Sequence, residues 1–399
     1  MASSGSFPIY LDNAASTPML DEVIREMLPY LKEHYGNPSS LHRFGRMTMR
    51  AIENARTRVS SLIGCKKHEI IFTSGGTEAN NLAIKGIADL VRKTNPEKKR
   101  IITSAIEHES ILEAFRDLEE NGFDVSYLPV TKEAQIETAA LKRTINDRTA
   151  LVSIMFSNNE VGTIQPISEL ATITHQKGGL FHTDAVQAVG KIPIDVKHLG
   201  VDLLSASSHK INGPKGVGAL YKREGLKLAA IIHGGGQEST LRSGTENVHG
   251  IVGFGKACEI AAQKIVAYKT EVSALRNYMI DRVLHEVPNA RLNCSTRNRI
   301  ANIAHFTFFG INGEDLIIKL DELGIAASTG SACSLRHQRP SHVLKAMGFS
   351  YAELTGSLRL SIGILNTKEE IDQAVSILSK AVDELRKLSP FDLEAYKQN

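Results

Sequence analysis

The chain has 399 residues, of which 42% are hydrophobic and 23% are charged. This composition excludes a disordered or collagen-like protein, and the length predicts a globular protein of two or three folding units. Lysine and arginine number 47 and aspartate and glutamate 44, so the net charge is +3 and does not indicate a dedicated surface for nucleic acid or anionic membranes.

The cysteines predict a reducing compartment. They lie far apart, without a Cys-x-x-Cys pair, at Cys65, Cys258, Cys294 and Cys333. This spacing fits neither a disulfide framework nor a tetrahedral zinc site. The N-terminal stretch lacks a basic region followed by an apolar run, and no later apolar stretch approaches about 18 residues. We therefore expect a cytoplasmic protein.

Short β-rich runs alternate with helical patterns over the first two thirds of the chain. The predicted strands are Ile70–Phe72, Ile101–Thr103, Leu151–Phe156, Leu180–His182, Leu203–Ala206 and Val217–Tyr221. Between them apolar residues recur at helical spacing, as at Ile52, Ala55, Val59 and Leu62. The alternation predicts an α/β fold in which right-handed crossover helices cover a largely parallel sheet.

The last third of the chain predicts a smaller second domain. From Asn247 to Glu286 the sequence is almost uninterrupted helix former without proline, which suits a long helix joining two domains. Beyond it, Asn302–Phe308 and Leu358–Ile362 predict strands. Thr367 and Glu370 form a capping box at the start of a final helix.

A lysine at the end of a predicted strand is the first candidate for chemistry. Lys210 follows an apolar strand and precedes a glycine-rich turn that ends at Gly218. Ligands of α/β proteins bind at strand ends, where a desolvated lysine could form an imine with an aldehyde cofactor. Considered by itself, however, this segment is more typical of a surface lysine in a turn. Its glycines run in the order G-x-x-G-x-G without a helix pattern, which excludes a dinucleotide site and hence NAD.

Two further strand ends carry polar groups. Asp184 ends a short apolar strand and could pair with a pyridinium nitrogen in the same crevice, although alone it is equally an N-cap. Gly76 and Thr77 lie where a strand passes through a glycine pair into a helix, a position that favours a phosphate; alone they indicate an ordinary turn. Together these groups are the three fixed points that pyridoxal 5'-phosphate requires.

With these motifs the chain resembles a known family. It is similar to class V, fold-type I pyridoxal-phosphate enzymes, and among them to cysteine desulfurases of the NifS and IscS kind. The matching motifs span nearly the whole chain and include Tyr10–Ala15 (YLDNAA), Gly36–His42 (GNPSSLH) and Ser357–Ser361 (SLRLS).

The resemblance implies a fold-type I transferase, with a mainly parallel seven-stranded sheet flanked by helices in a large domain and a smaller α+β domain. We place the large domain at residues 18–264. The small domain then comprises residues 1–17 and 265–399, with a mobile loop at about 328–342.

The resemblance also implies how the cofactor is held. Lys210 would bind it covalently, Asp184 would pair with its ring nitrogen, and His108 would stack on its ring. The phosphate would be bound by Gly76, Thr77, Ser207 and His209. Gln187 would contact the phenolic oxygen. Thr245 resembles a threonine that reaches the phosphate from the other subunit, which implies a homodimer with shared sites.

The substrate would be bound by Asn159, Asn37 and Arg359, the arginine through a bidentate salt bridge to the carboxylate. From the residues alone, Arg359 could instead lie on the exposed face of a strand. His108 could likewise be a helix-capping or half-buried histidine.

Cys333 separates a desulfurase from an aminotransferase of the same fold. It lies among glycine and serines, which favours a loop where its thiol can reach a substrate, whereas Cys258 is typical of a packed side chain. Its distance from Arg359 resembles the long-loop desulfurases, whose cysteine reaches partner proteins. The basic residues that follow, Arg336, His337 and Arg339, depart from the bacterial pattern and leave the acceptor open.

The resemblance therefore implies a cysteine desulfurase that gives L-alanine and a persulfide on Cys333. The sulfur would pass to an iron–sulfur scaffold or a sulfur-carrier protein, for cluster assembly or tRNA thiolation, without direct nucleic-acid or membrane binding. Three alternatives stay open: a selenocysteine lyase, an aminotransferase and a non-catalytic assembly scaffold. We expect no metal site, although Cys333 could share a partner's cluster.

Overall fold

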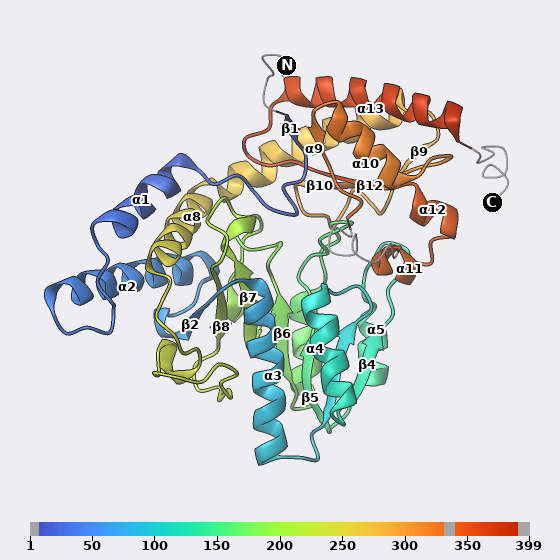
Figure 1. Cartoon of the computed structure of the whole chain (residues 1–399). Coiled ribbons are helices and arrows are strands. Elements are labelled where there is room, and N and C mark those ends of the chain that lie inside the picture. The colour runs from blue at the N-terminus through green and yellow to red at the C-terminus, as the bar shows by residue number, and fades with distance from the viewer. Residues whose placement is uncertain (1–7, 331–339, 390–399) are drawn as a thin grey trace.

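The computed structural model describes residues 8–330 and 340–389. Its centre is a seven-stranded sheet in the order β2-β8-β7-β6-β5-β3-β4 (Figure 1). The strands are β2 (Ile70–Thr73), β3 (Arg100–Ser104), β4 (Asp124–Leu128), β5 (Thr149–Ser153), β6 (Leu180–Asp184), β7 (Leu203–Ser207) and β8 (Gly218–Lys222). Only β8 runs antiparallel to its neighbours, so the mainly parallel sheet is as expected.

Helices cover both faces of this sheet, because alternate side chains of each strand point to opposite sides. The helices of this part are α1 (Asp21–Lys32), α2 (Arg43–Ile63), α3 (Gly76–Thr94), α4 (Glu109–Glu120), α5 (Thr138–Thr144), α6 (Ile167–Gln176), α7 (Val196–Leu199) and α8 (Val248–Ala267). Ile71, Ile101 and Leu151 pack against α3 and α4, whereas Phe72, Ile102 and Val152 pack against α2, α6 and α8.

A second hydrophobic core lies around a three-stranded antiparallel sheet in the order β12-β10-β9. These strands are β9 (Ala290–Leu292), β10 (Ile303–Phe308) and β12 (Ser357–Ser361). A short parallel pair joins β1 (Ile9–Tyr10) to β11 (Ile325–Ala326). The helices are α9 (Ser273–Glu286), α10 (Gly313–Glu322), α11 (His342–Ala346), α12 (Tyr351–Thr355) and α13 (Lys368–Leu388). Figure 1 shows α10 and α13 beyond this sheet, away from the larger one.

The predicted long helix is present with one interruption. α8 passes into a π-helical turn, Tyr268–Val272, and then directly into α9. Tyr268 and Val272 are buried in the second core. The helix therefore leaves the first core and enters the second at the turn, where an extra residue in the helical register changes which face is buried. The capping box of Thr367 and Glu370 at α13 is confirmed.

The division expected from the sequence, with residues 18–264 in the large domain and 1–17 and 265–399 in the small one, stays a prediction. Within the residues described, none of the helices is both long and apolar enough to span a membrane.

Candidate active site

A cavity of about 700 Å³ lies where the carboxyl ends of the parallel strands meet the second core. Asp184 and Ser207, the last residues of β6 and β7, form part of its wall, and Arg359 of β12 closes it from the other core. The edge formed by the carboxyl ends of the strands is where ligands bind in open α/β sheets.

Most of the predicted site residues converge on this cavity. Those that line it are Gly76, Thr77, His108, Asn159, Asp184, Gln187, Ser207, His209, Lys210 and Arg359. Asn37 and Thr245 are exposed and lie outside it, on the segments before α2 and α8. Cys333 and the basic residues that follow it, Arg336, His337 and Arg339, lie outside the described residues.

Lys210 is anchored to the segment that follows β1. It ends a 3₁₀ turn, Ser208–Lys210, directly after β7, and its Nζ donates to the carbonyl oxygens of Ala14 (2.7 Å) and Ala15 (2.8 Å). The same segment binds the backbone of this turn, since Thr17 N and Oγ1 both donate to the carbonyl of His209 at 2.9 Å. Two distant parts of the chain thus fix the lysine at the cavity wall.

Asp184 is a buried carboxylate with a defined orientation. Its Oδ2 accepts from Asn80 Nδ2 (2.8 Å) and its Oδ1 from the backbone N–H of Val186 (2.9 Å). These bonds orient the carboxylate and leave further lone pairs for an N–H of a ligand. The alternative that Asp184 caps a helix is wrong, because turns follow β6 and the next helix, α7, starts only at Val196.

His108 is both a helix cap and a wall of the cavity. The backbone N–H of Ser110 donates to its Nδ1 (3.1 Å) at the start of α4. Burial lowers the pKa of His108, more than the nearby charge of Asp184 raises it. The ring is therefore neutral at pH 7, and the hydrogen bond at Nδ1 assigns its proton to Nε2.

The sequence missed Asn80, which connects these groups. Its Nδ2 donates both to Asp184 and to Ser110 Oγ (2.8 Å), and this hydroxyl lies 2.9 Å from Nδ1 of His108. Asn80 could have been found from its spacing, because it lies three residues after Thr77 and hence on the same face of α3.

The start of α3 forms the candidate phosphate site. Its first turn packs so closely that a Cβ on Gly76 would lie 2.7 Å from Cγ2 of Val186, so any larger residue would force Val186 to move. The first amides of a helix lack intrahelical partners and attract anions. His209, near this site, has its pKa lowered to about 4 by burial and by the charges of Lys210, Lys215 and Lys191. Those lysines make the surroundings electropositive.

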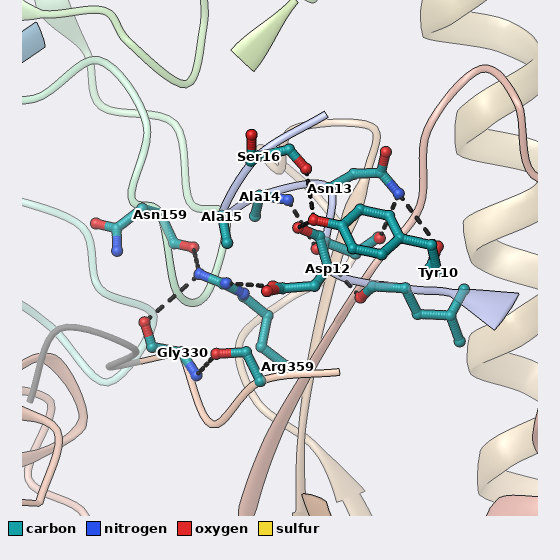
Figure 2. A network of polar contacts seen from close by, with 12 residues as sticks. Tyr10, Asp12, Asn13, Ala14, Ala15, Ser16, Asn159, Gly330 and Arg359 are labelled. Atoms are coloured by element: carbon teal, nitrogen blue, oxygen red, sulfur yellow. Dashed lines mark hydrogen bonds and ion pairs between the residues drawn. The ribbon is translucent and has the colours of Figure 1, made fainter. Parts of the chain in front are cut away.

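Arg359 is held by a polar network drawn in Figure 2. Its Nη2 donates to Oδ1 of Asp12 (2.7 Å) and its Nη1 to the carbonyl of Asn159 (2.8 Å). The side chain is 2% exposed, so the alternative of an exposed strand residue is wrong. Nε of Arg359 and Oδ1 of Asn159 are buried without a hydrogen-bond partner among the described residues.

These residues fit pyridoxal 5'-phosphate. An amine, a buried carboxylate, a neutral imidazole and the N-terminus of a helix face one cavity, and these are the groups that its aldehyde, ring nitrogen, ring and phosphate require. The orphaned polar atoms of Arg359 and Asn159 leave donor and acceptor capacity for a ligand beside it. No group of three or more His, Cys, Asp or Glu that could hold a metal occurs within residues 8–330 and 340–389.

Comparisons with known proteins agree with this fit. The aminotransferase class-V family model matches residues 9–374. A cysteine desulfurase IscS from Dictyoglomus turgidum (strain DSM 6724 / Z-1310) is 47% identical over 386 residues, 97% of this chain and 97% of that protein. The solved structure of a NifS-like protein is similar with a TM-score of 0.89 at 37% identity, covering 95% of this chain and 100% of that one.

A structure described as SspA in complex with cysteine is similar with a TM-score of 0.79 at 37% identity, covering 88% of this chain and 98% of that one. The chain therefore belongs to the class-V aminotransferase family and, within it, to the cysteine desulfurases, which are pyridoxal-phosphate-dependent enzymes.

Proposed function

We propose that the protein transfers the sulfur atom of L-cysteine to its own Cys333, with the cofactor held at Lys210. The carbon–sulfur bond of the substrate breaks and a sulfur–sulfur bond forms, so L-cysteine and the Cys333 thiol become L-alanine and a Cys333 persulfide. Atoms and electrons balance without an external oxidant. The observation that carries the proposal is the convergence of Lys210, Asp184 and Arg359 on one cavity.

Each cofactor-binding residue would have a separate role that follows from its chemistry. Lys210 would hold the cofactor covalently, and Asp184 would keep its ring nitrogen protonated through an ion pair. When bound, the cofactor supplies an electron sink for the electron pair released at the substrate's α carbon. His108 carries its proton on Nε2, where it is available for proton transfer within the cavity.

Arg359 would bind the substrate carboxylate. Asp12 and the Asn159 carbonyl fix its guanidinium, and its Nε is left without a partner among the described residues. A guanidinium offers five donors in one plane, so a carboxylate can bind it while these contacts persist. The SspA relative recorded with cysteine supports an amino acid of this size as the ligand.

The choice of Cys333 is supported by the state of the other thiols. Burial raises the pKa of Cys65 to about 12 and of Cys294 to about 11, and it raises the pKa of the fully buried Cys258 as well. Only a thiolate is a good nucleophile, so these three are poorly suited to attack a substrate. Gly330 and Pro340, the described residues that flank the segment containing Cys333, both line the cavity.

A homodimer is the proposed assembly. Large apolar side chains are exposed on α1, on α2 and between them, namely Ile24, Leu28, Leu31, Tyr35, Leu41, Phe44 and Met47. Such a concentration is typical of a protein interface. The sulfur acceptor would be an iron–sulfur scaffold or a sulfur-carrier protein; this acceptor and the cytoplasmic location stay predictions from the sequence.

The test is an assay of the purified protein after addition of pyridoxal 5'-phosphate. We expect a visible absorption band and, on addition of L-cysteine with a reductant, equal amounts of L-alanine and sulfide. Cys333→Ala should keep the band and lose sulfide release, whereas the control Cys294→Ala should keep both. Sulfide release by Cys333→Ala would contradict the role of Cys333. A strong preference for selenocysteine over cysteine would instead identify a selenocysteine lyase.

A further inference from the structure

Lys191 is a buried lysine next to the proposed cofactor site. It is 3% exposed and lies in the turns after β6, with its Nζ 3.0 Å from Oε1 of Gln187. Among the described residues no carboxylate forms an ion pair with it. Burying an ammonium without an anion is costly, so this position calls for an explanation beyond packing.

The groups around Lys191 are mainly cationic or neutral. Burial, together with the charges of Lys210 and Arg359, lowers its pKa to about 7. A small cavity beside it is also lined by Lys264 and Tyr268 of the α8–α9 helix. The charge of Lys191 also lowers the pKa of His209. These charges make the wall of the main cavity electropositive, which favours an anionic ligand there.

Lys191 determines which way the amide of Gln187 points. Its Nζ donates to Oε1 of Gln187 (3.0 Å), so Oε1 is the atom of the amide that faces the lysine. Nε2 then points the other way and donates to the carbonyl of Ala14 (2.8 Å), the same carbonyl that accepts from Lys210 Nζ. Nε2 has a second hydrogen, and Gln187 lines the cavity together with Lys210. Without Lys191, Oε1 of Gln187 would lose the donor that fixes it within the described part of the chain.

We propose that Lys191 is a positioning residue for the cofactor, which fixes the Gln187 amide so that Nε2 presents a donor to the phenolic oxygen. The inference rests on the proposed function, in which Gln187 contacts that oxygen. A fixed donor there, next to a buried cation, stabilises negative charge on the phenolic oxygen. It thereby lowers the pH at which the cofactor-linked nitrogen of Lys210 loses its proton.

The experiment compares apoprotein variants for cofactor binding and for the pH midpoint of the visible absorption band. Lys191→Met keeps the length of the side chain and fills the same apolar space, so the fold should persist. We expect the dissociation constant for pyridoxal 5'-phosphate to rise about tenfold, the factor equivalent to about 1.4 kcal/mol for one hydrogen bond to a charged partner. The pH midpoint should rise by about one unit, because a nearby cation and a donor are both lost.

Three further variants make the test specific. Lys191→Arg keeps a donor-only cation and should restore part of the midpoint shift. In a Gln187→Leu background, Lys191→Met should add little, because the lysine acts through the glutamine. Lys191→Gln, a neutral polar replacement, serves if Lys191→Met does not fold, and it should also raise the midpoint.

The outcomes distinguish a failure of the positioning role of Lys191 from a failure of the proposed function. A wild-type midpoint and affinity in Lys191→Met would overturn the positioning role, as would a full, additive effect of Lys191→Met in the Gln187→Leu background. A wild-type protein without any visible band would overturn the proposed function and this inference together. A wild-type band that yields no alanine from cysteine would overturn the proposed function alone.

Discussion

At the scale of single residues, the site depends on contacts between side chains that are far apart in the sequence. Asp12 is 347 positions from Arg359, yet the two form an ion pair at 2.7 Å (Figure 2). Arg359 is almost fully buried, so the loss of its carboxylate partner would leave a guanidinium less well fixed and less well compensated.

Asp12→Asn should therefore weaken substrate binding. The amide keeps the size of the side chain but removes its charge, and we expect KM for L-cysteine to rise about tenfold with kcat nearly unchanged, since a charge-assisted hydrogen bond contributes about 1.5–3 kcal/mol. Steady-state kinetics measure this split. Asp21→Asn, an exposed carboxylate at the start of α1, is the matched control. An unchanged or lower KM for Asp12→Asn would show that Asp12 does not position Arg359.

Sequence reasoning placed the residues that would touch the cofactor but missed those that hold them. Lys210 and Asp184 could be predicted because strand ends and family motifs mark them. Asn80 was missed although its spacing from Thr77 places it on the same face of α3. Lys191 could not be predicted, because it acts through a contact with another side chain, and no motif records that contact. Asn37 and Thr245 lie outside the cavity of the single chain, and their roles stay predictions.

At the scale of elements, burial decides which strands could be predicted. β5 and β7 are buried throughout and form continuous apolar or small-residue runs. β4 was missed because it is an edge strand, largely accessible, with polar Asp124 and Ser126 among its residues. The predicted strand Leu151–Phe156 began and ended too late, since β5 is Thr149–Ser153. The π turn between α8 and α9 was not predicted, because none of its five residues is a proline or glycine that would mark a break in the helix.

A buried histidine in β6 makes the stability of the sheet sensitive to acid. His182 contacts Ser153 Oγ (2.8 Å) on β5 and Ser205 Oγ (3.0 Å) on β7, and burial lowers its pKa to about 3. The unfolded chain therefore binds a proton at this residue more readily than the native state. Above about pH 6.5 His182 is neutral in both states and does not change the free energy of unfolding. As the pH falls from about 6.5 toward 3, the unfolded chain binds the proton and the native state does not, so the free energy of unfolding decreases.

His182→Asn should reduce this loss. Each fully titrating group of this kind contributes a slope of about 1.4 kcal/mol per pH unit, so the free energy of unfolding should fall less steeply between pH 6 and 4 in the variant. Denaturant unfolding of the apoprotein at several pH values measures the slope. His198→Asn, at an exposed position of α7, is the control. Equal slopes for His182→Asn and the wild type would show that His182 does not titrate on unfolding.

At the scale of the whole molecule, the cavity lies where two hydrophobic cores meet. The larger core surrounds the seven-stranded sheet and the smaller one surrounds β10 and β12. The cavity is lined by polar residues at the ends of β6 and β7 and by Arg359 of β12. In Figure 1 the segment after β1 passes between these two parts, and it is this segment that contacts Lys210 and Arg359. The sequence showed both parts through their periodicity, but not how their surfaces face each other.

The exposed apolar side chains around α1 and α2 predict a dimer. Leu41 is 90% exposed, and Tyr35 stacks on Phe44 with ring centroids 5.6 Å apart, also at the surface. We expect light scattering after size exclusion to give twice the mass of the chain, and the variant Leu41→Asp with Phe44→Asp to give a monomer, because two charges would be buried in the interface. Leu365→Asp, at another exposed apolar position, is the control. A monomeric wild type would contradict the dimer.

The central claim is that the cofactor is linked to Lys210, and one measurement tests it directly. The protein is incubated with pyridoxal 5'-phosphate, reduced with borohydride and digested, and the peptides are analysed by mass spectrometry. We predict one stoichiometric pyridoxyl adduct, on Lys210, and none on the neighbouring Lys191. An adduct on Lys191, or on other lysines with Lys210 unmodified, would contradict the account.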